Sequence, residues 1–142
     1  MKRLLVCLLL VGVVGCGESE SYTAIKAELR AMSEYNKGTD FAGRKDWAAA
    51  IACYTEAIRM DPDFAWAYGS RGVAYRHLEE YDKAIADYTE AIRINPDYAP
   101  AYLNRGVAHR ELGNDVKAAA DFAKAKKLGY GPEDEKPLTI FM

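Results

Sequence analysis

The sequence contains few of the residues that catalytic and metal sites need. It has two histidines, His77 and His109, and three cysteines among its 142 residues. It contains no glycine-rich phosphate loop, no Gly-x-Ser-x-Gly elbow and no His-Glu-x-x-His pair. These shortages exclude a cysteine–histidine zinc cluster and leave no convergent set of groups for a reaction. The sequence therefore predicts a protein that is not an enzyme and that holds no metal or other cofactor.

The sequence also lacks a strong excess of charge and lacks strand-like patterning. Its formal net charge is −2, and its 19 basic and 21 acidic side chains are interspersed along the sequence. The sequence therefore has no cluster of basic residues of the kind that binds nucleic acid. From Tyr22 onward, apolar residues recur at helical spacing, as at Ile25, Leu29 and Met32. These patterns predict an all-α protein of one compact unit that does not bind nucleic acid.

The N-terminus carries an apolar run that is too short to cross a membrane. Leu4–Val14 spans eleven residues and follows Lys2 and Arg3. A membrane-spanning helix needs about 20 apolar residues. A positive start followed by a run of this length is typical of a secretory leader. We therefore expect residues 1–15 to be a cleaved signal peptide.

The end of that leader, Val13-Val14-Gly15-Cys16, resembles the bacterial lipobox, in which a peptidase cuts before a cysteine that becomes lipidated. The resemblance implies a lipoprotein whose Cys16 carries acyl chains such as palmitate, with residues 16–22 as lipidated cysteine and tether. It also implies an extracytoplasmic location and, because Gly17 rather than Asp follows, the periplasmic side of the outer membrane in a two-membrane cell. An ordinary secretory leader with a chance cysteine is the alternative. Cys53 would have no partner for an internal disulfide.

A twelve-residue phrase occurs twice, at Tyr54–Ala65 and Tyr88–Ala99, with nine identities and an offset of 34 residues. The same offset aligns a third copy without gaps. The aligned positions hold small and aromatic residues: Gly38, Gly72 and Gly106; Ala50, Ala84 and Ala118; Tyr54, Tyr88 and Phe122; Ala57, Ala91 and Ala125. Small residues let two helices approach closely while aromatic rings fill the space beside them. Each copy therefore predicts two antiparallel helices, at about Ala65–Leu78 and Tyr81–Ile94 in the second copy.

This period and residue pattern resemble the tetratricopeptide repeat (TPR). The resemblance implies an α-solenoid of three helix-turn-helix repeats. They would cover residues 23–64 (an N-terminal helix extension and the first repeat), 65–98 and 99–130, with a tail at 131–142. It also implies a concave groove, lined by the first helix of each repeat, that binds an extended peptide or a partner helix. The implied groove residues are Tyr35, Asn36, Thr39, Trp66, Ser70, Val73, Arg76, Leu103, Asn104, Val107 and Arg110.

Several charged and aromatic residues carry more specific expectations. Trp66 is the expected anchor for a ligand, with Arg76 and Arg110 binding its acidic groups. The alternative is that both arginines form solvated ion pairs with Glu79, Glu80 or Glu111. The lysine-and-asparagine clamp of chaperone-binding members of the family is not reproduced, since Tyr35, Thr39 and Pro100 hold clamp positions. Asp87 and Asp121 are expected to form a solvated, outward acidic face.

The last repeat differs from the others where a further repeat would stack. Ile58 and Ile92 align with Lys126. A charge there is tolerable only where no fourth repeat follows, so Lys126 is expected to be exposed and the two isoleucines buried. Beyond it, residues 138–142 are mostly apolar, and we expect them to pack on the third repeat.

Three functions remain open from the sequence. The first is a lipid-anchored scaffold that binds a protein on the extracytoplasmic side. The second is an assembly subunit of a pilus or outer-membrane machine, and the third is a structural homo-oligomer held together through the tail or Cys53. A permanent, near-stoichiometric complex would favour the second, and the size of the purified domain would reveal the third.

Overall fold

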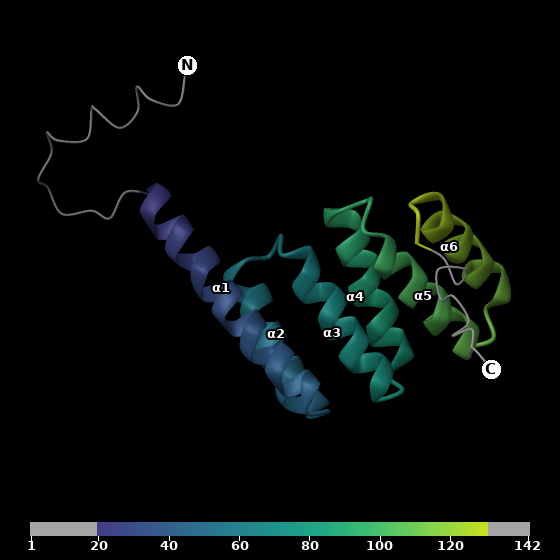
Figure 1. Ribbon diagram of the computed structural model, residues 1–142, viewed down its shortest axis with the longest axis horizontal. Helices are drawn as coiled ribbons and strands as arrows, with labels where there is room; N and C mark the ends of the chain where they lie inside the picture. Colours follow the sequence, from purple (N-terminus) through teal and green to yellow (C-terminus); the bar gives the residue numbers. More distant parts are fainter. Residues whose placement is uncertain (1–19, 131–142) are drawn as a thin grey trace, which may run out of the picture.

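The described part of the chain is a row of six α-helices (Figure 1). The computed structural model describes residues 20–130, so the predicted leader, Cys16 and the tail lie outside the described residues. The helices are α1 (Glu20–Gly43), α2 (Trp47–Met60), α3 (Ala65–His77), α4 (Tyr81–Ile94), α5 (Ala99–Glu111) and α6 (Asp115–Lys127). The all-α prediction is confirmed, and both helices of the second repeat end within one residue of their predicted bounds.

Each repeat is a pair of helices held together by a glycine and an aromatic ring. A Cβ atom added to Gly72 in α3 would lie 2.7 Å from a ring carbon of Tyr88 in α4. The equivalent distances are 2.6 Å from Gly38 to Tyr54 and 2.7 Å from Gly106 to Phe122. Real Cβ atoms do not approach so closely, so each ring fits only because its partner has no side chain. The periodic glycine and aromatic positions therefore fix the helix pairing in all three repeats.

The turn between the two helices of each repeat has the same backbone form. Gly113, in the turn of the third repeat, has a φ angle of +74°. The residues 34 and 68 positions earlier, Glu79 and Lys45, have φ angles of 59° and 62°. Left-handed backbone is unusual for residues with a side chain. The repeat geometry therefore decides the turn conformation even where no glycine is present.

Successive repeats stack so that their first helices lie closer to one another than their second helices do. Helix α2 contacts α3, and α4 contacts α5, which joins each repeat to the next. On one side α1 also contacts α3, and α3 contacts α5. Among the six described helices, α2 makes no such contact with α4, nor α4 with α6. The first helices of the repeats therefore line the inner side of the array.

Two aspartates have a different environment from the one predicted. Asp87 and Asp121 are buried, with 6% of each exposed, so the prediction of a solvated acidic face is wrong. Nε and Nη2 of Arg71 each donate a hydrogen bond of 2.8 Å to the Asp87 carboxylate, one to each oxygen. Arg105 binds Asp121 in the same way at 2.8 and 2.7 Å. A carboxylate that is paired in this bidentate way can be buried away from water.

The same arginines also join one repeat to the next. The third guanidinium nitrogen, Nη1, of Arg71 donates to Oγ1 of Thr55 in α2 at 3.0 Å. Nη1 of Arg105 donates to Oγ1 of Thr89 in α4 at 3.1 Å. Each guanidinium therefore bridges its own repeat and the preceding one, and the two bridges are 34 residues apart in sequence.

The two ends of the array match the predictions in part. Lys126 is exposed, as predicted for the last repeat, whereas Ile58 and Ile92 are half-buried rather than buried, because the neighbouring repeat covers only part of each. At the other end, α1 begins at Glu20, so residues 20–22 of the predicted tether are helical. None of the helices in residues 20–130 has the length and apolar character that crossing a bilayer requires.

Candidate protein-binding face

All eleven predicted groove residues lie on the helices of the inner side. Three come from α1, four from α3 and four from α5. None of them is buried: Asn36, Thr39, Trp66 and Arg110 are exposed, and the rest are half-buried. We call these eleven residues the inner face. The structure thus places every predicted residue on a first helix of a repeat, with its side chain at least partly accessible.

Part of the inner face already makes contacts within the array. The hydroxyl oxygens of Tyr35 and Ser70 are 3.3 Å apart, which links α1 to α3. The Tyr35 ring centroid is also 5.1 Å from that of Phe64 and 5.6 Å from that of Tyr54. Asn104 Nδ2 donates a hydrogen bond of 2.9 Å to the Pro100 carbonyl. Tyr35 and Asn104 therefore have structural contacts that a ligand would have to share.

Trp66 is the largest apolar group that the inner face offers to a ligand. It is the second residue of α3, and 55% of it is exposed. Its ring centroid lies 6.5 Å from that of Phe64, so one side of the indole has a protein contact. A half-exposed tryptophan loses little side-chain entropy on binding and can bury a large area. Its position therefore suits the predicted role of anchor.

Arg76 and Arg110 are two cationic side chains in the last turns of α3 and α5. Neither forms an ion pair with an acid in residues 20–130, so the alternative of pairs with Glu79, Glu80 or Glu111 is not what the structure contains. Nε of Arg76 is buried without a hydrogen-bond partner among the described residues. A buried N–H without a partner is costly. The inner face therefore presents positive charge that this part of the chain does not neutralise.

Each of these arginines lies beside the aromatic ring of its own repeat. The Arg110 guanidinium carbon is 5.7 Å from the centroid of Phe122. Tyr88, the residue aligned with Phe122, is completely buried, and burial raises the pKa of its hydroxyl strongly, although the positive charge of Arg76 acts in the opposite direction. The Phe122 ring thus supports the Arg110 guanidinium, and Arg76 holds the equivalent position near Tyr88 in the second repeat.

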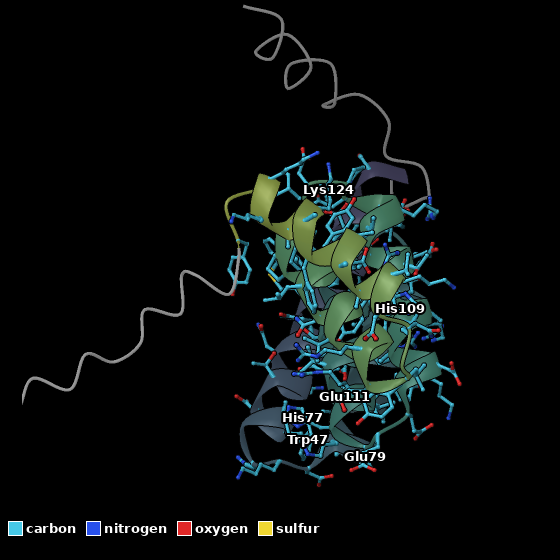
Figure 2. The ribbon with its side chains drawn as sticks, turned by 90° about the vertical axis from the view of Figure 1, so that its right-hand side faces the viewer. Trp47, His77, Glu79, His109, Glu111 and Lys124 are labelled. Carbon is cyan, nitrogen blue, oxygen red and sulfur yellow. The ribbon has the colours of Figure 1, made fainter. Side chains whose placement is uncertain are left out.

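One contact between α2 and α3 was not predicted from the sequence. The rings of Trp47, at the start of α2, and His77, at the end of α3, are stacked with centroids 4.0 Å apart and 4° between planes (Figure 2). Burial, and then the charges of Arg76 and Lys45, lower the pKa of His77. The only sign of this contact in the sequence is that the position of Trp47 is also aromatic in the second repeat, where Tyr81 aligns with it. The stack explains a histidine that needs no catalytic role.

The other histidine is a packing residue. His109 in α5 is buried, and its Nδ1 has no hydrogen-bond partner among the described residues. Burial lowers its pKa, so the neutral form is favoured. Within residues 20–130 no three histidine, cysteine or acidic side chains are grouped as a metal site requires. The described side chains thus offer a surface for binding and no arrangement for metal chemistry.

Models of one protein family match three overlapping stretches of the chain. Two described as "Tetratricopeptide repeat" match residues 65–98 and 87–120, and one described as "TPR repeat" matches residues 38–78. A search of curated proteins gave no match. Together the matched stretches include all of α2, α3, α4 and α5, and parts of α1 and α6.

Solved structures of the same kind are similar over most of the array. The second TPR of Spaghetti (RPAP3), bound to the HSP90 peptide SRMEEVD, is 32% identical with a TM-score of 0.71, over 72% of this chain and 95% of that one. The Arabidopsis OM64 TPR domain is 32% identical with a TM-score of 0.72, over 78% and 88%. The second TPR domain of human RPAP3, with the HSP70 peptide SGPTIEEVD, is 32% identical with a TM-score of 0.70, over 72% and 85%.

Proposed function

This chain belongs to the tetratricopeptide repeat family, and from that membership we propose that it is a membrane-anchored scaffold that binds a protein segment on its inner face. The family fold is typically a non-catalytic scaffold for protein interaction. Two of the similar structures contain bound peptides. The segment bound here would be an extended peptide or a helix that crosses α1, α3 and α5.

The observation that supports this proposal is that the first helices of successive repeats contact one another, whereas the second helices do not. Because α3 contacts α1 and α5 while the second helices stay apart, the inner face is a continuous strip across three repeats. An exposed indole at Trp66 lies on that strip, together with two guanidinium groups, on Arg76 and Arg110, that have no acidic partner among residues 20–130. Aromatic and arginine side chains are the commonest energetic anchors of protein interfaces.

The charge of the strip supports a ligand with acidic groups. Side chains 34 residues apart hold equivalent places in neighbouring repeats, so Arg76 and Arg110 present like charges on the first helices of successive repeats. Such charges are stabilised by a carboxylate that can bind one or both of them. The acidic groups of the ligand would therefore lie at the ends of α3 and α5, and its apolar groups at Trp66.

Capture of the natural partner by the full lipoprotein in mild detergent tests this proposal. Replacing Trp66→Ala is expected to weaken capture by about tenfold or more while the helical signal stays intact. Replacing Arg76→Ala and Arg110→Ala together is expected to weaken capture mainly at low salt, because salt already screens these charges at higher concentration. The matched control replaces Arg59→Ala and Arg93→Ala, two arginines on the second helices. Capture that survives in every variant would place the ligand elsewhere.

The proposed anchor has its own test. We infer a lipid on Cys16 from the Val-Val-Gly-Cys sequence behind the leader, which places the scaffold on the extracytoplasmic side of a membrane. Labelling cells with a fatty-acid analogue should mark the parent chain and the Cys53→Ala control, whereas Cys16→Ala should remain unlabelled and uncut. Equal labelling of all three chains would exclude this site of attachment.

A further inference from the structure

Four apolar side chains form an exposed stripe along the first half of α1. Tyr22, Ile25, Leu29 and Met32 are 54, 55, 64 and 51% exposed. Their spacing of three and four residues places them on one side of the helix. We call these four residues the α1 stripe. The periodic apolar residues that predict this helix therefore lie on its exposed side. In most helices at the edge of a fold, the apolar side faces the core instead.

The stripe lies on a part of α1 that extends beyond the rest of the array. Ala31 and Gly38 are buried, and Gly38 packs against Tyr54 of α2. By helical geometry these two residues are on the side of α1 opposite the stripe. With 24 residues against 14, α1 is about 15 Å longer than α2. Figure 1 shows the first turns of α1, in purple, running past the ends of α2 and α3.

The start of α1 is also the part of the fold closest to the proposed lipid. Helix α1 begins at Glu20, which is four residues after Cys16. Four residues span at most about 14 Å when fully extended. A lipid on Cys16 would therefore hold the first turn of α1 within that distance of the membrane surface.

We propose that the α1 stripe lies on the surface of the lipid bilayer, as a second membrane contact beside the lipid on Cys16. This inference rests on the proposed lipidation. An amphipathic helix parallel to the surface buries its apolar side among the acyl chains and keeps its cations at the phosphates. Lys26 Nζ is 5.8 Å from the centroid of Tyr22, so a cation lies beside the stripe, and tyrosine is a residue favoured at this depth.

The size of the stripe favours a bilayer over a protein partner. Four half-exposed side chains present on the order of 400 Å² of apolar surface. A specific protein interface buries about 800 Å² on each partner. A patch half that size is small for a dimer, yet it adds usefully to an acyl anchor, because stable attachment takes more than one weak signal. With two attachment points, the array would have a restricted orientation on the membrane.

Fluorescence quenching by brominated lipid tests the proposal on the mature lipoprotein. The chain is reconstituted in vesicles of phosphatidylethanolamine and phosphatidylglycerol, with or without phospholipids brominated in the upper acyl chain. A Leu29→Trp variant reports on the stripe. The matched control is Val116→Trp in α6, at a site that is 86% exposed at the other end of the array. Trp47 and Trp66 contribute the same background to both.

The fluorescence added by Leu29→Trp is expected to fall by at least about twofold in brominated vesicles, while that added by Val116→Trp stays unchanged. Adding Ile25→Glu to Leu29→Trp should remove the quenching. Equal behaviour at both positions, in a chain that still floats with the vesicles, overturns the proposal and leaves the lipid anchor in place. A chain that does not float overturns both. A Leu29→Trp spectrum that shifts to the blue with protein concentration, in detergent without vesicles, overturns it in favour of a second copy.

Discussion

The first repeat and the second repeat share a helix pair and a left-handed turn, but they have different side chains at the place where their helices meet. In the second repeat, Arg71 and Asp87 form a buried bidentate pair. The aligned residues of the first repeat are Lys37 and Cys53. Lys37 is exposed and pairs with Glu34 on its own helix, and Cys53 is a half-buried free thiol.

What the two repeats share is the packing of a ring against a glycine. Tyr54 lies against Gly38 in the first repeat as Tyr88 lies against Gly72 in the second. Both tyrosines are buried. The comparison indicates that close packing defines the repeat, and that the buried ion pair is an addition found in the second and third repeats. Substitutions in the two repeats measure these contributions separately.

The largest loss is expected where the shared packing is removed. Tyr88→Ala should lower the free energy of unfolding by about 3–5 kcal/mol, because it leaves a cavity against Gly72 at the centre of the array. Tyr54→Ala should cost a similar amount if packing is equivalent in the two repeats. Urea unfolding followed by circular dichroism measures both. A loss below about 1 kcal/mol for either variant would show that packing does not define the repeats.

A smaller loss is expected when the buried pair is broken. Asp87→Ala leaves the Arg71 guanidinium, with 17% of its side chain exposed, without its carboxylate, which should cost about 3 kcal/mol. The matched control is Glu90→Ala on the same helix, which removes an exposed pair with Arg93 and should cost less than about 1 kcal/mol. Equal losses for the two variants in urea unfolding would mean that burial adds nothing to the pair.

Transplanting the pair into the first repeat sharpens the comparison. Lys37→Arg combined with Cys53→Asp gives the first repeat the residues of the second. If the backbones are equivalent, the double variant should be within about 1 kcal/mol of the parent, whereas Cys53→Asp alone should be less stable, because it places an unpaired charge in a half-buried site. A double variant no more stable than Cys53→Asp would show that the two repeats differ in backbone as well as in side chains.

The smallest effect is expected from pH. His109 in the third repeat holds the position of Tyr75 in the second, and burial lowers its pKa, with Asp121, Lys117 and Arg105 as nearby charges. The folded state therefore disfavours the charged form. Stability should be constant above the unfolded-state pKa of about 6.5 and should fall as pH drops from there through the lower folded-state pKa. His109→Tyr should reduce the fall in melting temperature between pH 7.5 and 5.5, and an unchanged fall would exclude His109 as its cause.

The fold could be predicted because its determinants repeat locally. Glycine, alanine and aromatic residues recur at a fixed offset of 34, so the helix pairs follow from the sequence. The buried pairs could not be predicted in the same way. Arg71 and Asp87 are 16 residues apart on two helices, and only their packing shows that the carboxylate is enclosed. A charged residue considered alone is normally assigned to the surface.

The inner face was predicted as a set of positions, and the structure adds how each one is used. The sequence could not show that Tyr35 is engaged with Ser70, or that Arg76 and Arg110 lack acidic partners among the described residues, because both depend on distances between repeats. It also gave no means of expecting that Tyr22, Ile25, Leu29 and Met32 would be exposed, since apolar spacing identifies a helix face without saying what covers it.

The most direct test of the central claim is site-specific photo-crosslinking in cells. A photoreactive residue is placed on the inner face at Leu103 in α5, and in a separate variant at the exposed Ala86 on α4. If the inner face binds a protein segment, the Leu103 variant should give a discrete adduct with one partner, and Trp66→Ala in the same chain should reduce it. Adducts from position 86 without any from position 103 would contradict the account.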